Sequence, residues 1–133
     1  MKVQGGCHCG RVRYEAEVDP ERVTICHCTD CQALTGTAYR VSVRTLQKDF
    51  VLLSGLPKTY VKTAESGAKR AQVFCADCGS PLYAHALGDT ETYGLRVGGL
   101  AQRRELAPKK QIWCRSSMPW AKSIGDLPGR ERE

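Results

Sequence analysis

Seven of the eight cysteines in this 133-residue chain fall into three short groups, and this spacing constrains the fold more than any other feature. The groups are Cys7 and Cys9 in GGCHCG, Cys26, Cys28 and Cys31 in CHCTDC, and Cys75 and Cys78 in FCADCG. The N-terminus shows no apolar signal segment, so we expect a reducing, cytoplasmic environment, where closely spaced cysteines bind metal or do redox chemistry. A disulfide between cysteines one residue apart would be badly strained. The cysteines therefore predict zinc binding.

Alternating hydrophobicity predicts a mostly β fold with few short helices. In residues 11–18 the inward positions are Val12, Tyr14, Ala16 and Val18. In residues 37–45 we expect Tyr39, Val41 and Val43 to face inward and Arg40, Ser42 and Arg44 to face outward. Further strands are predicted over residues 50–54, 59–63, 71–75, 81–86, 92–97 and 111–114.

Helices are expected in only two places. Thr29 or Asp30 is predicted to cap a short helix that ends at Gly36, and a second short helix is predicted over residues 119–127. The length fits a single domain. We place this domain at residues 1–128 and a flexible tail at residues 129–133.

The net charge of +6 suits a protein that attracts small anions or nucleic acid. The basic residues are spread along the chain without a dense block, and only nine aromatic residues are available for stacking on bases. Nucleic acid is therefore not expected as the main partner. No apolar run approaches the roughly 18 residues of a membrane span, so no membrane association is expected either.

The first and last cysteine groups together supply four thiolates, the number that closes a tetrahedral zinc site. Cys7 and Cys9 point to one side of an extended segment and His8 to the other. Gly79, which follows the second pair, gives the backbone the freedom to turn N–H groups toward sulfur. We predict one structural zinc site that joins the N-terminal strand to the middle of the chain, although the spacing also allows the groups to pair differently. Its ligands are Cys7, Cys9, Cys75 and Cys78.

The middle group has three cysteines. Cys26 and Cys28 share one face of an extended segment, and Cys31 follows where the chain turns helical, so all three sulfurs can reach one metal ion. Three protein ligands and an open fourth position are typical of catalytic zinc. The alternative fourth ligand is Cys114 or a histidine. Of the histidines, His8 and His27 lie between ligands and should point away, and His85 has the pattern of an ordinary strand residue.

We therefore predict that Cys26, Cys28 and Cys31 are catalytic as well as metal ligands. A zinc ion with three thiolates is a weak Lewis acid but is suited to hold an incoming thiolate. A free thiol is mostly protonated at neutral pH, so binding of this kind would deliver a nucleophile. The nucleophile would attack an electrophile such as an aldehyde, or the reverse reaction would cleave the adduct.

The sequence resembles the glutathione-dependent formaldehyde-activating enzyme family, which also includes centromere protein V. The matching segments are GGCHCGRVRYE, CHCTDCQALTGTAY, FCADCGSPLY and a closing series of PKKQIW, MPW and DLP. The resemblance implies a β-tent fold of short antiparallel sheets around the two zinc sites described above. It also implies carbon–sulfur lyase activity, as in the formation of S-hydroxymethylglutathione from formaldehyde and glutathione. The chain departs from the family pattern at Gln111, where a histidine is common, and at Ala101, where an aspartate is usual.

The sequence also allows two functions other than a carbon–sulfur lyase. IWCRSS resembles the catalytic-cysteine segment of B-type methionine sulfoxide reductases, which would make Cys114 a redox residue. The third hypothesis is a non-catalytic zinc module that binds nucleic acid or protein. For the enzyme, the expected partners are a small-molecule thiol–aldehyde adduct, with glutathione as a candidate thiol, and a second copy of the chain in a homodimer.

Overall fold

The computed structural model describes residues 1–88 and 91–133. Its ten strands and one α-helix are β1 (Lys2–Gly6), β2 (Arg13–Glu17), β3 (Val23–Cys26), α1 (Thr29–Thr35), β4 (Arg40–Leu46), β5 (Phe50–Ser54), β6 (Lys58–Thr63), β7 (Lys69–Phe74), β8 (Pro81–Ala86), β9 (Thr92–Arg96) and β10 (Lys110–Ile112). The short 3-10 turns are η1 (Pro20–Arg22), η2 (Gln47–Asp49), η3 (Val97–Gly99), η4 (Arg103–Glu105), η5 (Cys114–Ser116), η6 (Pro119–Lys122) and η7 (Ile124–Asp126). The predicted mostly β fold is confirmed.

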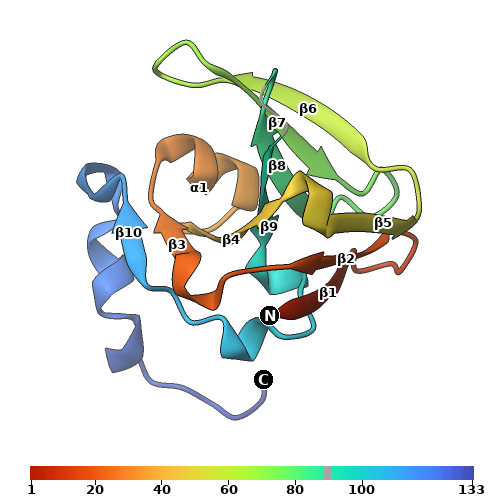
Figure 1. The fold of residues 1–133 in the computed structure, drawn as a ribbon. Helices are drawn as coiled ribbons and strands as arrows, with labels where there is room; N and C mark the ends of the chain where they lie inside the picture. The colour runs from red at the N-terminus through yellow and green to blue at the C-terminus, as the bar shows by residue number, and fades with distance from the viewer. Residues whose placement is uncertain (89–90) are drawn as a thin grey trace.

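The strands form two sheets (Figure 1). The small sheet has the order β1-β2-β5, and the large sheet has the order β10-β3-β4-β9-β8-β7-β6. All neighbouring strands are antiparallel except β10, which lies parallel to β3. The expected antiparallel sheets are therefore found, and the one parallel pair lies at an edge where the chain returns through a long connection rather than a hairpin.

The core lies between the two sheets, as the alternation predicted. Val12, Tyr14, Ala16 and Val18 are all buried, and Val43 and Leu95 of the large sheet are completely inaccessible. Tyr14 packs on Phe50, whose ring also contacts those of Tyr83 and Tyr93. Tyr14 passes so close to β1 that a Cβ on Gly5 would lie 2.2 Å from its ring, so only glycine fits there.

Helix α1 begins at the second cysteine group. The residue that caps its N-terminus is Cys28, whose Sγ accepts a hydrogen bond from the Cys31 backbone N–H at 3.3 Å, so the predicted caps Thr29 and Asp30 are wrong. The predicted end is confirmed, because Gly36 takes the left-handed conformation with φ of 68°. The helix lies beside β3 and over β4 (Figure 1), and Asp30 pairs with Lys62 of β6 at 2.9 Å.

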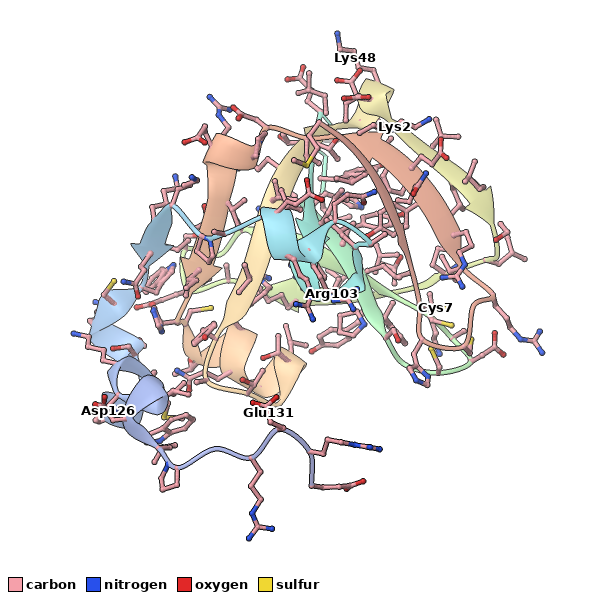
Figure 2. The ribbon with its side chains drawn as sticks, turned by 90° about the horizontal axis from the view of Figure 1, so that it is seen from below. Lys2, Cys7, Lys48, Arg103, Asp126 and Glu131 are labelled. Carbon is pink, nitrogen blue, oxygen red and sulfur yellow. The ribbon has the colours of Figure 1, made fainter. Side chains whose placement is uncertain are left out.

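The C-terminal segment contains turns rather than the helix predicted over residues 119–127. Two 3-10 turns, η6 and η7, occupy this stretch, and each has only three or four residues. Pro119 starts the first turn, and Gly125, a poor helix former, lies within the second, which disfavours one continuous helix. In Figure 2 this segment, marked by Asp126, lies on the opposite side of the molecule from Cys7. Among the described residues, no helix has the length and apolar character that crossing a lipid bilayer requires.

Candidate metal centres

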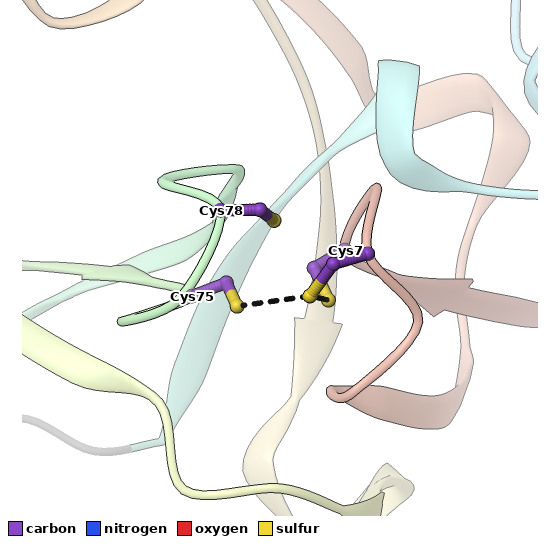
Figure 3. Close-up of side chains that lie close together, drawn as sticks. Cys7, Cys75 and Cys78 are labelled. Atoms are coloured by element: carbon purple, nitrogen blue, oxygen red, sulfur yellow. Dashed lines mark hydrogen bonds between the residues drawn. The ribbon is translucent and has the colours of Figure 1, made fainter.

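The structure brings the first and last cysteine groups together. Cys7 and Cys9 lie in the turn between β1 and β2, and Cys75 and Cys78 lie in the loop between β7 and β8. The sulfurs of Cys7, Cys75 and Cys78 face one another in Figure 3, and the sulfurs of all four cysteines lie within 4.8 Å of one another. The Sγ atoms of Cys7 and Cys9 are 3.5 Å apart and those of Cys9 and Cys75 are 3.7 Å apart. Sulfurs in a zinc tetrahedron with 2.3 Å bonds are separated by about 3.8 Å, so these two distances are compatible with a zinc site.

Backbone and hydroxyl donors surround this four-cysteine group. The Val12 N–H donates to the Cys7 Sγ at 3.2 Å, and the Ser80 hydroxyl lies 3.2 Å from the Cys78 Sγ. The Ser80 contact is the main reason that the pKa of Cys78 falls to about 5. Gly79 has a φ of 78°, and its N–H bonds back to the Cys75 carbonyl oxygen at 2.9 Å, which closes the turn between the ligands. These donors favour thiolates, the form that binds metal.

The three cysteines of the middle group also converge. Cys26 ends β3, Cys28 caps α1 and Cys31 lies in the first turn of α1, and their sulfurs all lie within 4.8 Å of one another. The hydrogen bond from Cys31 is the largest influence that lowers the pKa of Cys26, to about 5, and nearby Arg40 lowers it further. Cys31 is the donor in this hydrogen bond, and the bond therefore raises the pKa of Cys31. Of these two thiols, Cys26 is thus the one that loses its proton more readily.

No fourth ligand joins this three-cysteine group from residues 1–88 or 91–133. Cys114, the alternative that the sequence left open, is exposed in η5 and lies outside the group. His27 points away, as expected: its Nε2 donates to the Gln111 Oε1 at 2.7 Å, and its ring packs edge-on against Tyr39. Gln111, a position where the chain departs from the family pattern, therefore binds a histidine that lies between Cys26 and Cys28.

A cavity of about 600 Å³ opens beside the three-cysteine group. Cys26 and Cys28 line it, together with Arg40, Arg96 and Trp113. Arg40 was expected to face outward from its strand. This outward face is indeed opposite the core, but it forms the floor of the cavity rather than open surface. Arg96 was not predicted to be a cavity residue. Its strand was predicted, but a strand alone does not reveal which face a cavity covers.

These observations define a class: a mostly β protein with two cysteine groups that are compatible with zinc, one of four sulfurs and one of three, the second beside a cavity. The sequence model of the glutathione-dependent formaldehyde-activating enzymes matches residues 2–116. The chain belongs to this family.

A solved structure supports the fold assignment. The chain is similar to the crystal structure of a Rhodobacter sphaeroides protein, with a TM-score of 0.65 and 23% sequence identity. The similarity covers 84% of this chain and 100% of that one. No protein among the curated ones matches the chain.

Proposed function

We propose that this protein is a zinc-dependent enzyme of the carbon–sulfur lyase type, which acts on the adduct of a thiol with a small aldehyde. The observation that carries the proposal is the three-cysteine group, which no further Cys, His, Asp or Glu of the described residues completes. The name of the family to which the chain belongs refers to glutathione and formaldehyde, so these are the first substrates to test.

Cys26, Cys28 and Cys31 would hold the catalytic zinc, and Cys7, Cys9, Cys75 and Cys78 the structural zinc. When bound by three thiolates, zinc supplies a fourth position that favours a thiolate over a thiol. The overall reaction is redox-neutral. The thiol sulfur forms a bond to the carbonyl carbon, the carbonyl π bond breaks, and the proton released from the thiol ends on the oxygen that becomes a hydroxyl group.

The residues of the cavity position the two reactants. Cys26 and Cys28 stand at one end, so the substrate sulfur is placed there, and Ile112 and Trp113 supply an apolar wall for the hydrocarbon part of the thiol. Ile112 is held next to Cys26 by the parallel pairing of β10 with β3. The His27 N–H donates to the Ile112 carbonyl oxygen at 3.1 Å and extends this pairing past the strand. Holding sulfur and aldehyde in one enclosed space lowers the entropic part of the barrier.

The test is the rate at which glutathione and formaldehyde form S-hydroxymethylglutathione, measured by carbon-13 exchange NMR against the spontaneous reaction. The zinc-loaded protein should accelerate the exchange, and Cys28→Ser should abolish the acceleration and lose one of two zinc equivalents while the fold remains. Cys114→Ser is the matched control, since it removes a thiol outside both groups. Full acceleration by Cys28→Ser, or no acceleration with any thiol–aldehyde pair, would contradict the proposal.

A further inference from the structure

One face of the large sheet gathers positive charge around the cavity. In an antiparallel pair, residues directly opposite each other point to the same face. Cys26 of β3 is opposite Arg40 of β4, and Ser42, two positions after Arg40, is opposite Arg96 of β9. The register therefore places Arg40 and Arg96 on the same face as the Cys26 sulfur. These cations are far apart in the sequence, and only the strand order brings them together.

Acidic residues do not balance this charge. Of the described residues that line the cavity, seven are Arg or Lys and two are Asp or Glu. Both acids are engaged: Asp30 pairs with Lys62 at 2.9 Å, and Glu65 pairs with Arg115 at 3.2 Å. None of the ion pairs formed within residues 1–88 and 91–133 includes Arg40 or Arg96. Arg40 and Arg96 thus lie on the cavity floor without an acidic partner from the described part of the chain.

Arg40 brings to this floor a buried donor that has no acceptor, and Gln72, which contacts Arg96 but does not line the cavity, has a second one. Arg96 is only 9% exposed and donates to the Gln72 Oε1 at 2.7 Å. The Nε of Arg40 and the Nε2 of Gln72 are buried, and neither finds a partner among the described residues. Buried donors in proteins are nearly always paired, because an unpaired one loses its hydrogen bond to water. A group with acceptor oxygens is the complement that this floor lacks.

Burial, with a smaller contribution from neighbouring Arg40, lowers the pKa of Arg96 to about 9. An anion nearby would therefore stabilise the charged guanidinium group. Zinc with three thiolates would carry one net negative charge, and the substrate thiolate would add a second, which together offset the two guanidinium charges. The need for acceptor oxygens thus comes from the unpaired Arg40 donor rather than from net charge.

We propose that Arg40 and Arg96 form a subsite for an oxyanion of the substrate thiol, a carboxylate or a sulfonate, beside the three-cysteine group. The inference rests on the proposed function, in which the thiol sulfur lies at that group. Arg40 is one strand away from Cys26 and Arg96 is two strands away, and neighbouring strands lie about 4.8 Å apart. The sulfur and the oxyanion of the ligand should therefore be separated by roughly 5–10 Å. Guanidinium groups bind such oxyanions through paired hydrogen bonds.

The experiment compares two thiols of the same length on the zinc-loaded full chain by isothermal titration calorimetry. These are 4-mercaptobutyrate, which has a carboxylate, and 4-mercapto-1-butanol, which is neutral. The carboxylate should bind at least tenfold more tightly, and Arg40→Gln should reduce the two affinities to near equality. Arg104→Gln, an exposed substitution away from every described cavity that changes the net charge equally, should keep the preference. A third thiol, 3-mercapto-1-propanesulfonate, distinguishes the oxyanions: a matching preference indicates a general oxyanion subsite, and a weaker one indicates a carboxylate subsite.

Each remaining outcome counts against a specific claim. Equal binding of the acid and the alcohol by the wild-type protein would overturn the subsite and leave the proposed function standing. Equal loss of preference in Arg40→Gln and Arg104→Gln would also overturn it, because the preference would then follow net charge alone. Failure of every thiol to bind would remove the proposed function and the subsite with it. If Arg40→Gln does not fold, Arg40→Lys keeps the charge but loses the paired donors, and it should reduce the preference severalfold; an unchanged preference would overturn the subsite.

Discussion

Substitution of two cysteines in the four-cysteine group, or of one cysteine in the three-cysteine group, leaves two cysteines in either group. Neither pair should then retain zinc. The variants are Cys9→Ser/Cys78→Ser, at two exposed positions, and Cys28→Ser, at a half-buried one. Neither variant removes a fully buried side chain, so differences in packing are small. The comparison therefore reports how much each metal stabilises the fold.

The expected magnitudes follow from the chain length that each metal closes. The four-cysteine group joins Cys9 to Cys75, which are 66 residues apart. A link of this span, treated like a disulfide, stabilises the fold by about 4 kcal/mol through the entropy of the unfolded chain. The three-cysteine group closes only the short loop from Cys26 to Cys31, which is worth about 2 kcal/mol on the same scale. For 133 residues these free energies correspond to losses in Tm of about 15 °C and about 7 °C.

The assay is thermal unfolding followed by circular dichroism on the zinc-loaded wild-type protein and both variants, with the zinc content of each sample measured. Each variant should lose about one zinc equivalent. The Tm of Cys9→Ser/Cys78→Ser should fall roughly twice as far as that of Cys28→Ser. Equal decreases, or a larger decrease for Cys28→Ser, would refute the view that the four-cysteine group is the structural one.

Three further predictions concern single residues. Gly5→Ala should destabilise the fold by about 1–3 kcal/mol in a urea titration, because its Cβ would lie 2.2 Å from a buried tyrosine ring; Gly98→Ala, with nothing within 4 Å, is the control, and equal stabilities would show that the ring has room to move. Gln111→Leu should cost about 1–3 kcal/mol, since the buried His27 Nε2–H loses its acceptor; unchanged stability in the same titration would show that the pair contributes nothing. Cys114→Ser should leave turnover and zinc content at wild-type levels, because this exposed thiol lies outside both cysteine groups, and loss of either would return Cys114 to the site.

The local features of the fold could be predicted from the sequence. Alternation identified the face of β2 that is buried, and the predicted limits of β8 coincide with those of the structure. Such patterns depend on neighbours one to four residues away, which the sequence displays directly. The N-cap of α1 was missed because serine, threonine, aspartate and asparagine are the usual caps, whereas here the Cys28 sulfur accepts the N–H bond.

The sequence by itself determined the three short cysteine clusters, since cysteines two or three residues apart stay together wherever the chain goes. The tertiary structure decided which other residues lie beside those cysteines. The placement of the small sheet against the large one brings the β1–β2 turn to the β7–β8 loop, and the strand order of the large sheet places Arg40 and Arg96 beside Cys26. These contacts join strands that are distant in sequence, and their register follows from the burial of whole sheet faces, which no short stretch of residues specifies.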